Sequence, residues 1–143
     1  MLFVGGGRRV SLAKAFIDAG AEIFAYELDV DAPINAVATE VFRGLGWNDS
    51  KVVSDLHSVI ELVKPSVIVP LQDAAVITCI KTGKSFRWLP SLLTADMCYD
   101  KFTLDDFLGT HFPALRIGCA GNNRLIKPRF GFGSRGIRRL TLE

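Results

Sequence analysis

At 143 residues, the chain is long enough for one domain, or for one domain and part of a second. Hydrophobic residues make up 49% and charged residues 22%, the balance of a globular protein with a buried core. No apolar run reaches the ~18 residues that a membrane span needs, and no signal peptide is recognisable. The three cysteines are far apart and in no metal-ligand spacing, which favours reduced thiols in a cytoplasmic protein.

Charge is distributed unevenly along the chain. Residues 1–106 carry 10 Lys/Arg and 14 Asp/Glu, whereas residues 107–142 carry 7 Lys/Arg and no acidic residue. A basic C-terminal segment after a mildly acidic body indicates an anionic ligand such as phosphate. We do not expect a nucleic acid, because the basic residues alternate with apolar ones and only Phe130 and Phe132 are available for stacking.

The start of the chain has the pattern strand, glycine turn, helix, strand. Leu2–Val4 is a short apolar run that leads directly into Gly5-Gly6-Gly7. Apolar residues then recur at helical spacing over residues 8–19, and Gly20 can end that helix. Residues 21–27 predict a second strand, which we expect to be parallel to the first with a right-handed crossover.

The glycine run allows two interpretations. The dinucleotide fingerprint G-x-G-x-x-G would place its third glycine at Val10, so the match is partial, although Glu27 or Asp29 can serve as the acidic residue that binds a ribose. An NAD-binding Rossmann domain is therefore an alternative. Arg8, at the start of the following helix, is instead a candidate for binding a carboxylate or phosphate of a substrate.

The middle of the chain continues the alternation. Strand patterns lie at residues 41–42, 66–71 and 89–93, and helical patterns at residues 50–63 and 74–81. The continuous apolar run at 66–71 is typical of strands that a parallel sheet buries on both faces. Gln72 and Asp73 follow it at its carboxyl end, where open sheets bind ligands, so Asp73 is a candidate substrate contact. We expect a doubly wound, mostly parallel α/β domain over residues 1–93.

The last third of the chain predicts a helix and a β-hairpin. The helix covers residues 100–108, and the hairpin strands are Leu125-Ile126 and residues 137–142. Between the strands, residues 127–136 read K-P-R-F-G-F-G-S-R-G, in which three glycines allow close approach to the backbone. The N–H groups of such a loop suit phosphate, and Lys127 and Arg135 supply positive charge. No Walker A motif is present.

The motif K-P-x-x-G-x-G-S-x-G-I between two strands resembles the glycine-rich loop of the ATP-grasp family. The segment C-Y-D-K-F-T at 98–103 is similar to the helix that precedes this loop, and G-G-G-R-R-V-S-L with D-V-D-A-P is similar to the start of carbamoyl-phosphate-synthase-like members. The resemblance covers nearly the whole chain but only the front part of the family's architecture. It implies a Rossmann-like pre-ATP-grasp domain over residues 1–93 and an incomplete first ATP-grasp lobe over residues 94–143.

The resemblance also implies a function. Such proteins are ATP-dependent carboxylate-amine ligases that form an acyl phosphate from a small-molecule carboxylate before an amine attacks it. The residues implied to contact the ATP phosphates are Lys101, Lys127, Gly131, Gly133, Ser134, Arg135 and Gly136. Mg²⁺ ligands are expected outside this chain, no catalytic residue is assigned, and the chain alone is expected to be inactive. The expected partner is a second copy, through the C-terminal hairpin, or a separate chain that carries the rest of the fold. A non-catalytic nucleotide- or anion-binding module is the alternative.

Overall fold

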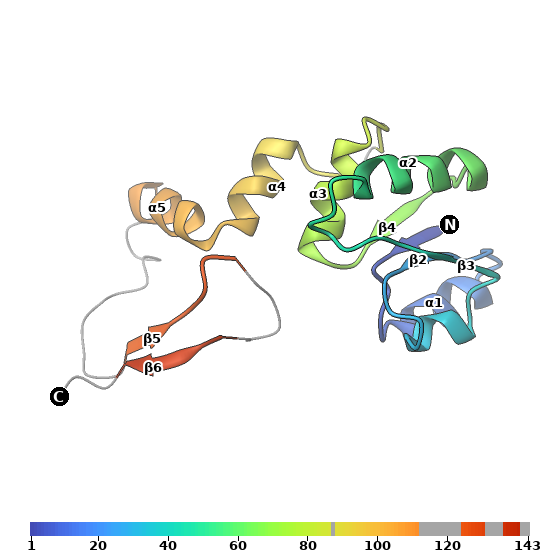
Figure 1. The fold of residues 1–143 in the computed structure, drawn as a ribbon, viewed down its shortest axis with the longest axis horizontal. Coiled ribbons are helices and arrows are strands. Elements are labelled where there is room, and N and C mark those ends of the chain that lie inside the picture. The colour runs from blue at the N-terminus through green and yellow to red at the C-terminus, as the bar shows by residue number, and fades with distance from the viewer. Residues whose placement is uncertain (87, 112–123, 131–135, 141–143) are drawn as a thin grey trace. The chain divides into compact units, whose positions relative to one another are not determined.

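The protein divides into two compact units, Met1–Leu92 and Leu93–Glu143 (Figure 1). The structure is a computed structural model that describes residues 1–86, 88–111, 124–130 and 136–140. The division lies close to the boundary expected after residue 93. Assignment of the units as a pre-ATP-grasp domain and the start of a lobe stays a prediction.

The first unit is an α/β domain built on a four-stranded sheet. Its strands are β1 (Leu2–Val4), β2 (Phe24–Glu27), β3 (Glu40–Arg43) and β4 (Ile68–Pro70). They are ordered β3-β2-β1-β4, and every pair is parallel. The helices are α1 (Val10–Asp18), the short 3-10 helix η1 (Pro33–Ala36), α2 (Val52–Val63) and α3 (Asp73–Lys81). The strand-helix alternation predicted from the sequence is confirmed through α3.

A core lies on each face of this sheet, because successive side chains of a strand point to opposite faces. On one face, Leu2, Val4 and Tyr26 pack with α2 and α3, through residues such as Leu56 and Cys79. On the other face, the core comprises Phe3, Ala13, Ile23, Ala25, Ala32 and Ile34, drawn partly from α1 and η1. Figure 1 shows α1 below the sheet and α2 and α3 above it. The doubly wound architecture is thus observed.

Local signals end the helices where the sequence places them. Gly20 follows α1 with φ +88°, a conformation that costs glycine little. Lys64, before Pro65, ends α2 in the left-handed region with φ 48°. At the start of α2, the N-cap residue Lys51 makes no side-chain capping hydrogen bond. Asp49 Oδ1 instead accepts the N–H of Lys51 at 2.8 Å, in the turn before the helix.

Strand β4 lies at the edge of the described sheet, with β1 as its neighbour. Val67 and Leu71 bond to β1, so the alternating positions 68 and 70 face the open side. Pro70 has no N–H to offer there, and the Ile68 carbonyl accepts the indole N–H of Trp88 at 2.8 Å. Proline and a capped carbonyl are features that discourage further strand pairing.

The expected strand at residues 89–93 is not observed, which corrects the sequence prediction. The chain forms a turn there and then enters α4 (Leu92–Tyr99). Pro90 interrupts the apolar run and cannot donate to a ladder. The open edge of β4 also lacks a backbone N–H donor at Pro70, so it offers residues 89–93 a poor partner for strand pairing.

The second unit contains two helices and a hairpin. Helix α4 is followed by α5 (Lys101–His111), and strands β5 (Arg124–Ile126) and β6 (Arg138–Leu140) pair antiparallel, with Ile126 opposite Arg138. The predicted helix and hairpin are confirmed. In the described ranges, no helix has both the length and the apolar character to cross a membrane.

Candidate functional site

The glycine run after β1 uses its backbone N–H groups inside the protein. Gly5 donates to the Tyr26 carbonyl at 2.9 Å, and Gly7 donates to Glu27 Oε2 at 2.7 Å. The other Glu27 oxygen accepts the N–H of Leu28 at 3.0 Å, and Glu27 is only 5% exposed. A dinucleotide site needs such amides for pyrophosphate and such a carboxylate for ribose. Because the Gly7 amide and the Glu27 carboxylate bond to each other here, neither is available for NAD, which argues against a dinucleotide site.

The carboxyl end of β4 carries a second internal polar contact. Gln72 Oε1 accepts the indole N–H of Trp47 at 3.1 Å, and Gln72 Nε2 donates to the Gly5 carbonyl at 3.3 Å. Asp73 is exposed at the first position of α3, and Arg8 is exposed before α1. No ion pair between described residues joins Arg8 to Asp73. Trp47 is a contact that no sequence motif signals.

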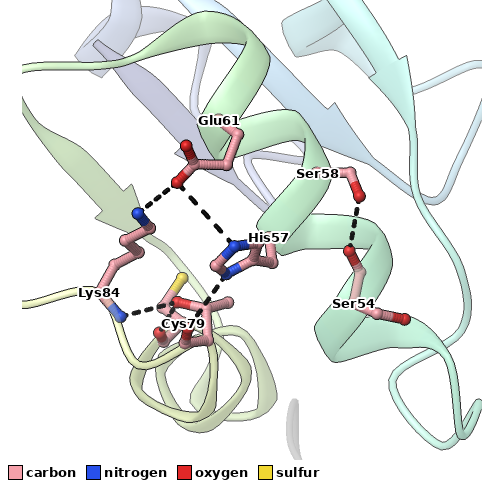
Figure 2. Close-up of polar contacts among 7 residues, drawn as sticks. Ser54, His57, Ser58, Glu61, Cys79 and Lys84 are labelled. Atoms are coloured by element: carbon pink, nitrogen blue, oxygen red, sulfur yellow. Dashed lines mark hydrogen bonds and ion pairs between the residues drawn. The ribbon is translucent and has the colours of Figure 1, made fainter.

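A polar cluster fastens α2 to the turn after α3 (Figure 2). His57 Nδ1 lies 3.1 Å from the Thr82 carbonyl and therefore carries a proton, and Lys84 forms an ion pair with Glu61. Thr82 Oγ1 donates to the Cys79 carbonyl at 2.7 Å. Burial raises the pKa of Cys79 to about 12, so its thiol stays protonated at neutral pH. The cluster is a structural clamp and not a nucleophile with its base.

In the second unit, Asp100 occupies the junction between α4 and α5 and caps α5. Its Oδ1 accepts the N–H of Phe102 at 3.1 Å, and its Oδ2 accepts the hydroxyl of Thr103 at 2.8 Å. Aspartate is among the preferred N-cap residues because it satisfies N–H groups that have no partner in the helix. The residue is 8% exposed. The turn therefore fixes where Lys101, the first residue of α5, begins the helix.

Arg129, from the segment after β5, forms a two-pronged ion pair with the same carboxylate. Arg129 Nε lies 2.8 Å from Asp100 Oδ1, and an Nη lies 2.5 Å from Oδ2. Arg129 and the hydrogen bonds hold the pKa of Asp100 well below its usual range, and Asp100 raises the pKa of Arg129. The N–H of Lys101 also donates to the Arg129 carbonyl at 3.3 Å. Both side chain and backbone thus link the two segments.

Two aromatic rings contact the Arg129 guanidinium. Its central carbon lies 5.4 Å from the centroid of the Phe102 ring and 5.3 Å from that of Phe130. Tyr99 packs on Phe130 with ring centroids 5.6 Å apart. Such contacts are favourable and restrict the orientation of the guanidinium plane.

The predicted phosphate-binding residues fall into two groups. Lys101 begins α5, and Lys127 is exposed directly after β5. Gly136 has φ +74°, and a Cβ there would lie 2.7 Å from Pro128 Cγ, so only glycine suits that position. The remaining loop residues, Gly131, Gly133, Ser134 and Arg135, lie outside the described residues.

Sequence reasoning missed Asp100 and Arg129 as site residues, although both lie in the quoted motifs. A usable signal was present, because an acidic residue precedes Lys101 and a basic residue follows Lys127 by two positions. Their pairing required knowledge of which segments meet.

Comparison with known proteins finds relatives by structure only. No protein-family model and no curated protein matches the chain. An N5-carboxyaminoimidazole synthetase from Staphylococcus aureus complexed with ADP matches with a TM-score of 0.68 at 16% identity, over 99% of this chain and 41% of that one. Glycinamide-RNase-transformylase T from Mycobacterium tuberculosis matches with a TM-score of 0.61 at 20% identity, over 87% and 38%. Phosphoribosylglycinamide synthetase from Anaerococcus prevotii matches with a TM-score of 0.57 at 18% identity, over 76% and 28%.

These likenesses establish the fold and not the activity, because the identities are 16 to 20%. The chain spans 41% or less of each of these three structures. None of the three is a carbamoyl-phosphate synthase, so that narrower resemblance still depends on the sequence motifs alone. The α/β fold, with its parallel four-stranded sheet, is thus shared with part of each of these structures.

Proposed function

We propose that this chain is the N-terminal portion of an ATP-dependent carboxylate-amine ligase of the ATP-grasp kind. The observation that carries the proposal is the link between Asp100-Lys101 and Lys127–Arg129, which gathers two lysines beside the hairpin that bears the glycine-rich motif. Structural neighbours that include ADP complexes support it. The carbamoyl-phosphate-synthase-like subtype is part of the proposal and has only the sequence motifs in its favour.

In the proposed function, the second unit binds the phosphates of ATP. Lys101, Lys127 and Arg135 neutralise the charge of the phosphates, and the loop residues Gly131, Gly133, Ser134 and Gly136 offer them backbone N–H groups. Fixed positive charge of this kind stabilises phosphoryl transfer, in which charge spreads over the phosphate oxygens. The product of that transfer is an acyl phosphate, which requires a second lobe. In the first unit, Arg8 is proposed to bind a substrate carboxylate or phosphate, and Asp73 an amine.

The described residues do not form a magnesium site. They contain no group of three or more His, Cys, Asp or Glu side chains placed to hold a metal. The buried carboxylate of the site, Asp100, is already engaged by Arg129 and by α5. We therefore place the Mg²⁺ ligands in residues other than these, and we expect this chain alone to lack turnover.

The second candidate is a non-catalytic module that binds a nucleotide or an anion. The same lysines would hold the phosphates, and no metal would be needed. It is favoured by the lack of a metal-binding group in the described part of the chain. Turnover after addition of the missing lobe separates the two candidates, because the module would bind ATP without consuming it.

Calorimetric titration of the chain with ATP and with NAD tests the proposal. We expect ATP to bind weakly and NAD not to bind, because Glu27 engages the amide that NAD would need. Lys127→Ala should weaken ATP binding, whereas Lys14→Ala, which removes an exposed lysine from α1, should not. Tight NAD binding with no response to ATP contradicts the proposal.

A steady-state assay tests the expected lack of turnover. The pure chain should hydrolyse no ATP in the presence of Mg²⁺. If the pure chain hydrolyses ATP and Lys127→Ala abolishes the hydrolysis, the metal site lies within this chain, against our expectation.

A further inference from the structure

One carboxylate joins the two segments that carry the candidate phosphate-binding lysines. Asp100 directly precedes Lys101, and Arg129 follows Lys127 by two residues. Asp100 accepts two hydrogen bonds from Arg129 while it caps α5, and the Arg129 carbonyl accepts the N–H of Lys101. The helix start and the end of the hairpin strand are therefore held at three points.

This link limits how far the two lysines can separate. Two residues of extended chain span at most about 7 Å, so Lys127 stays close to the backbone of Lys101. The rings of Phe102 and Phe130 also contact the guanidinium, which restricts rotation of Arg129. The link thus fixes direction as well as distance.

The ion pair does not have the geometry of a ligand-binding arginine. Nε and one Nη of Arg129 point at Asp100, at 2.8 and 2.5 Å, and the two charges neutralise each other. Because its charge is neutralised by Asp100, Arg129 attracts an incoming phosphate only weakly. Its effect on a ligand has to pass through the residues that it holds.

We propose that Asp100 and Arg129 are positioning residues that hold Lys101 and Lys127 together, so that both ammonium groups bind one polyphosphate. The inference rests on the proposed function, since it takes ATP as the ligand. Preorganised lysines bind more tightly because less side-chain and backbone freedom is lost on binding. The pair acts on affinity without contacting the ligand.

The affinity of the full 143-residue chain for ATP gives the first test. We expect Arg129→Gln and Asp100→Asn each to weaken binding by roughly tenfold, within the range for coupled neighbours. The double variant should bind ATP no more weakly than the weaker-binding of the two single variants, because all three lose the same interaction. Arg138→Gln, which removes the same charge from β6 in the same unit, is the matched control and should stay near wild type. If wild type binds ATP and Arg129→Gln binds as well as Arg138→Gln, the inference is overturned.

A second readout does not depend on ATP. A short amine-reactive crosslinker should join Lys101 to Lys127 efficiently in wild type and Arg138→Gln, and poorly in Arg129→Gln and Asp100→Asn, as measured by peptide mass spectrometry. Hydrogen exchange of the β5–β6 amides checks that the hairpin remains paired. Should Arg129→Gln unfold the hairpin, Arg129→Lys, which keeps the charge and loses the fork, takes its place.

The two readouts separate the inference from the proposed function. If wild type binds no ATP, the proposed function fails, and the crosslinking yields alone decide whether the pair positions the lysines. Equal yields in all variants overturn the inference. A loss of ATP affinity without a loss of crosslinking also overturns it, because Arg129 would then act on the ligand through its own charge.

Discussion

Several acidic side chains of this protein bind groups of its own structure. Glu27 accepts the N–H groups of Gly7 and Leu28, and Asp55 accepts the hydroxyl of Tyr26 at 2.7 Å. Burial, strengthened by the bond to Asp55, raises the pKa of Tyr26 above its usual range, so the phenol remains a hydrogen-bond donor. A carboxylate at the end of a strand is therefore not by itself evidence of a ligand site.

Gly44 shows how closely this network is packed. A Cβ at Gly44 would lie 2.3 Å from Cε1 of the Tyr26 ring. That ring is fully buried and is held by Asp55 and by the N–H of Leu45, so it cannot move aside. We expect Gly44→Ala to lower the free energy of unfolding of the first unit by about 1–3 kcal/mol, measured by urea denaturation.

Gly46→Ala is the matched control for that substitution. A Cβ at Gly46 would meet no atom within 4 Å, and Gly46 is two residues away in the same loop. Its free energy of unfolding should stay close to that of wild type. Equal stabilities for the two variants would mean that the Tyr26 ring does not occupy the described position.

At the scale of elements, the junction of α5 with the hairpin depends on one ionised carboxylate. The folded pKa of Asp100 is lowered, chiefly by Arg129 and further by the cap of α5. A lowered pKa contributes stability that is complete above the unfolded pKa of about 3.9 and is lost as the pH falls through the folded pKa. The junction should therefore be insensitive to pH between 5 and 8.

Asp100→Asn tests this dependence. At neutral pH it should reduce hydrogen-exchange protection at the start of α5, and the difference from wild type should shrink as the pH falls below about 4. Asp106→Asn, an exposed position in the same helix, should show no such dependence. A difference that grows in acid would mean that Asp100 is not ionised in the folded protein.

At the scale of the whole molecule, the two units differ in how much core they have. The residues of the two sheet cores lie in the first unit, whereas the described hairpin of the second unit has two strands. A two-stranded hairpin is marginally stable in isolation. Ile137 and Phe130 are 37% and 50% exposed, so the second unit has apolar surface left to bury.

We expect residues 1–92 to fold alone and to remain monomeric, while the full chain self-associates through the second unit. An uncovered hairpin edge with exposed apolar residues tends to find a partner. Light scattering of both proteins at the same molar concentrations, with circular dichroism to verify folding, measures this. A monodisperse monomer for the full chain would show that the hairpin needs no partner.

The sequence by itself determined most of the first unit and the existence of the hairpin. Helical spacing, the stop at Gly20 and the apolar strand runs are local signals, and local sterics and burial decide them. The same signals failed at residues 89–93, because an apolar run becomes a strand only where another strand offers a free edge. Pro70 and Trp88 block that edge, and both lie outside the run.

The candidate site was likewise predictable from the sequence only in part. The lysine and glycine motifs were recognisable from residue type and spacing, and they indicate phosphate without any structure. Only the tertiary structure decided that Glu27 engages Gly7 and that Asp100 engages Arg129, 29 residues away. Whether a charged side chain binds a ligand or its own fold depends on which group lies within hydrogen-bond distance, and chain folding sets that distance.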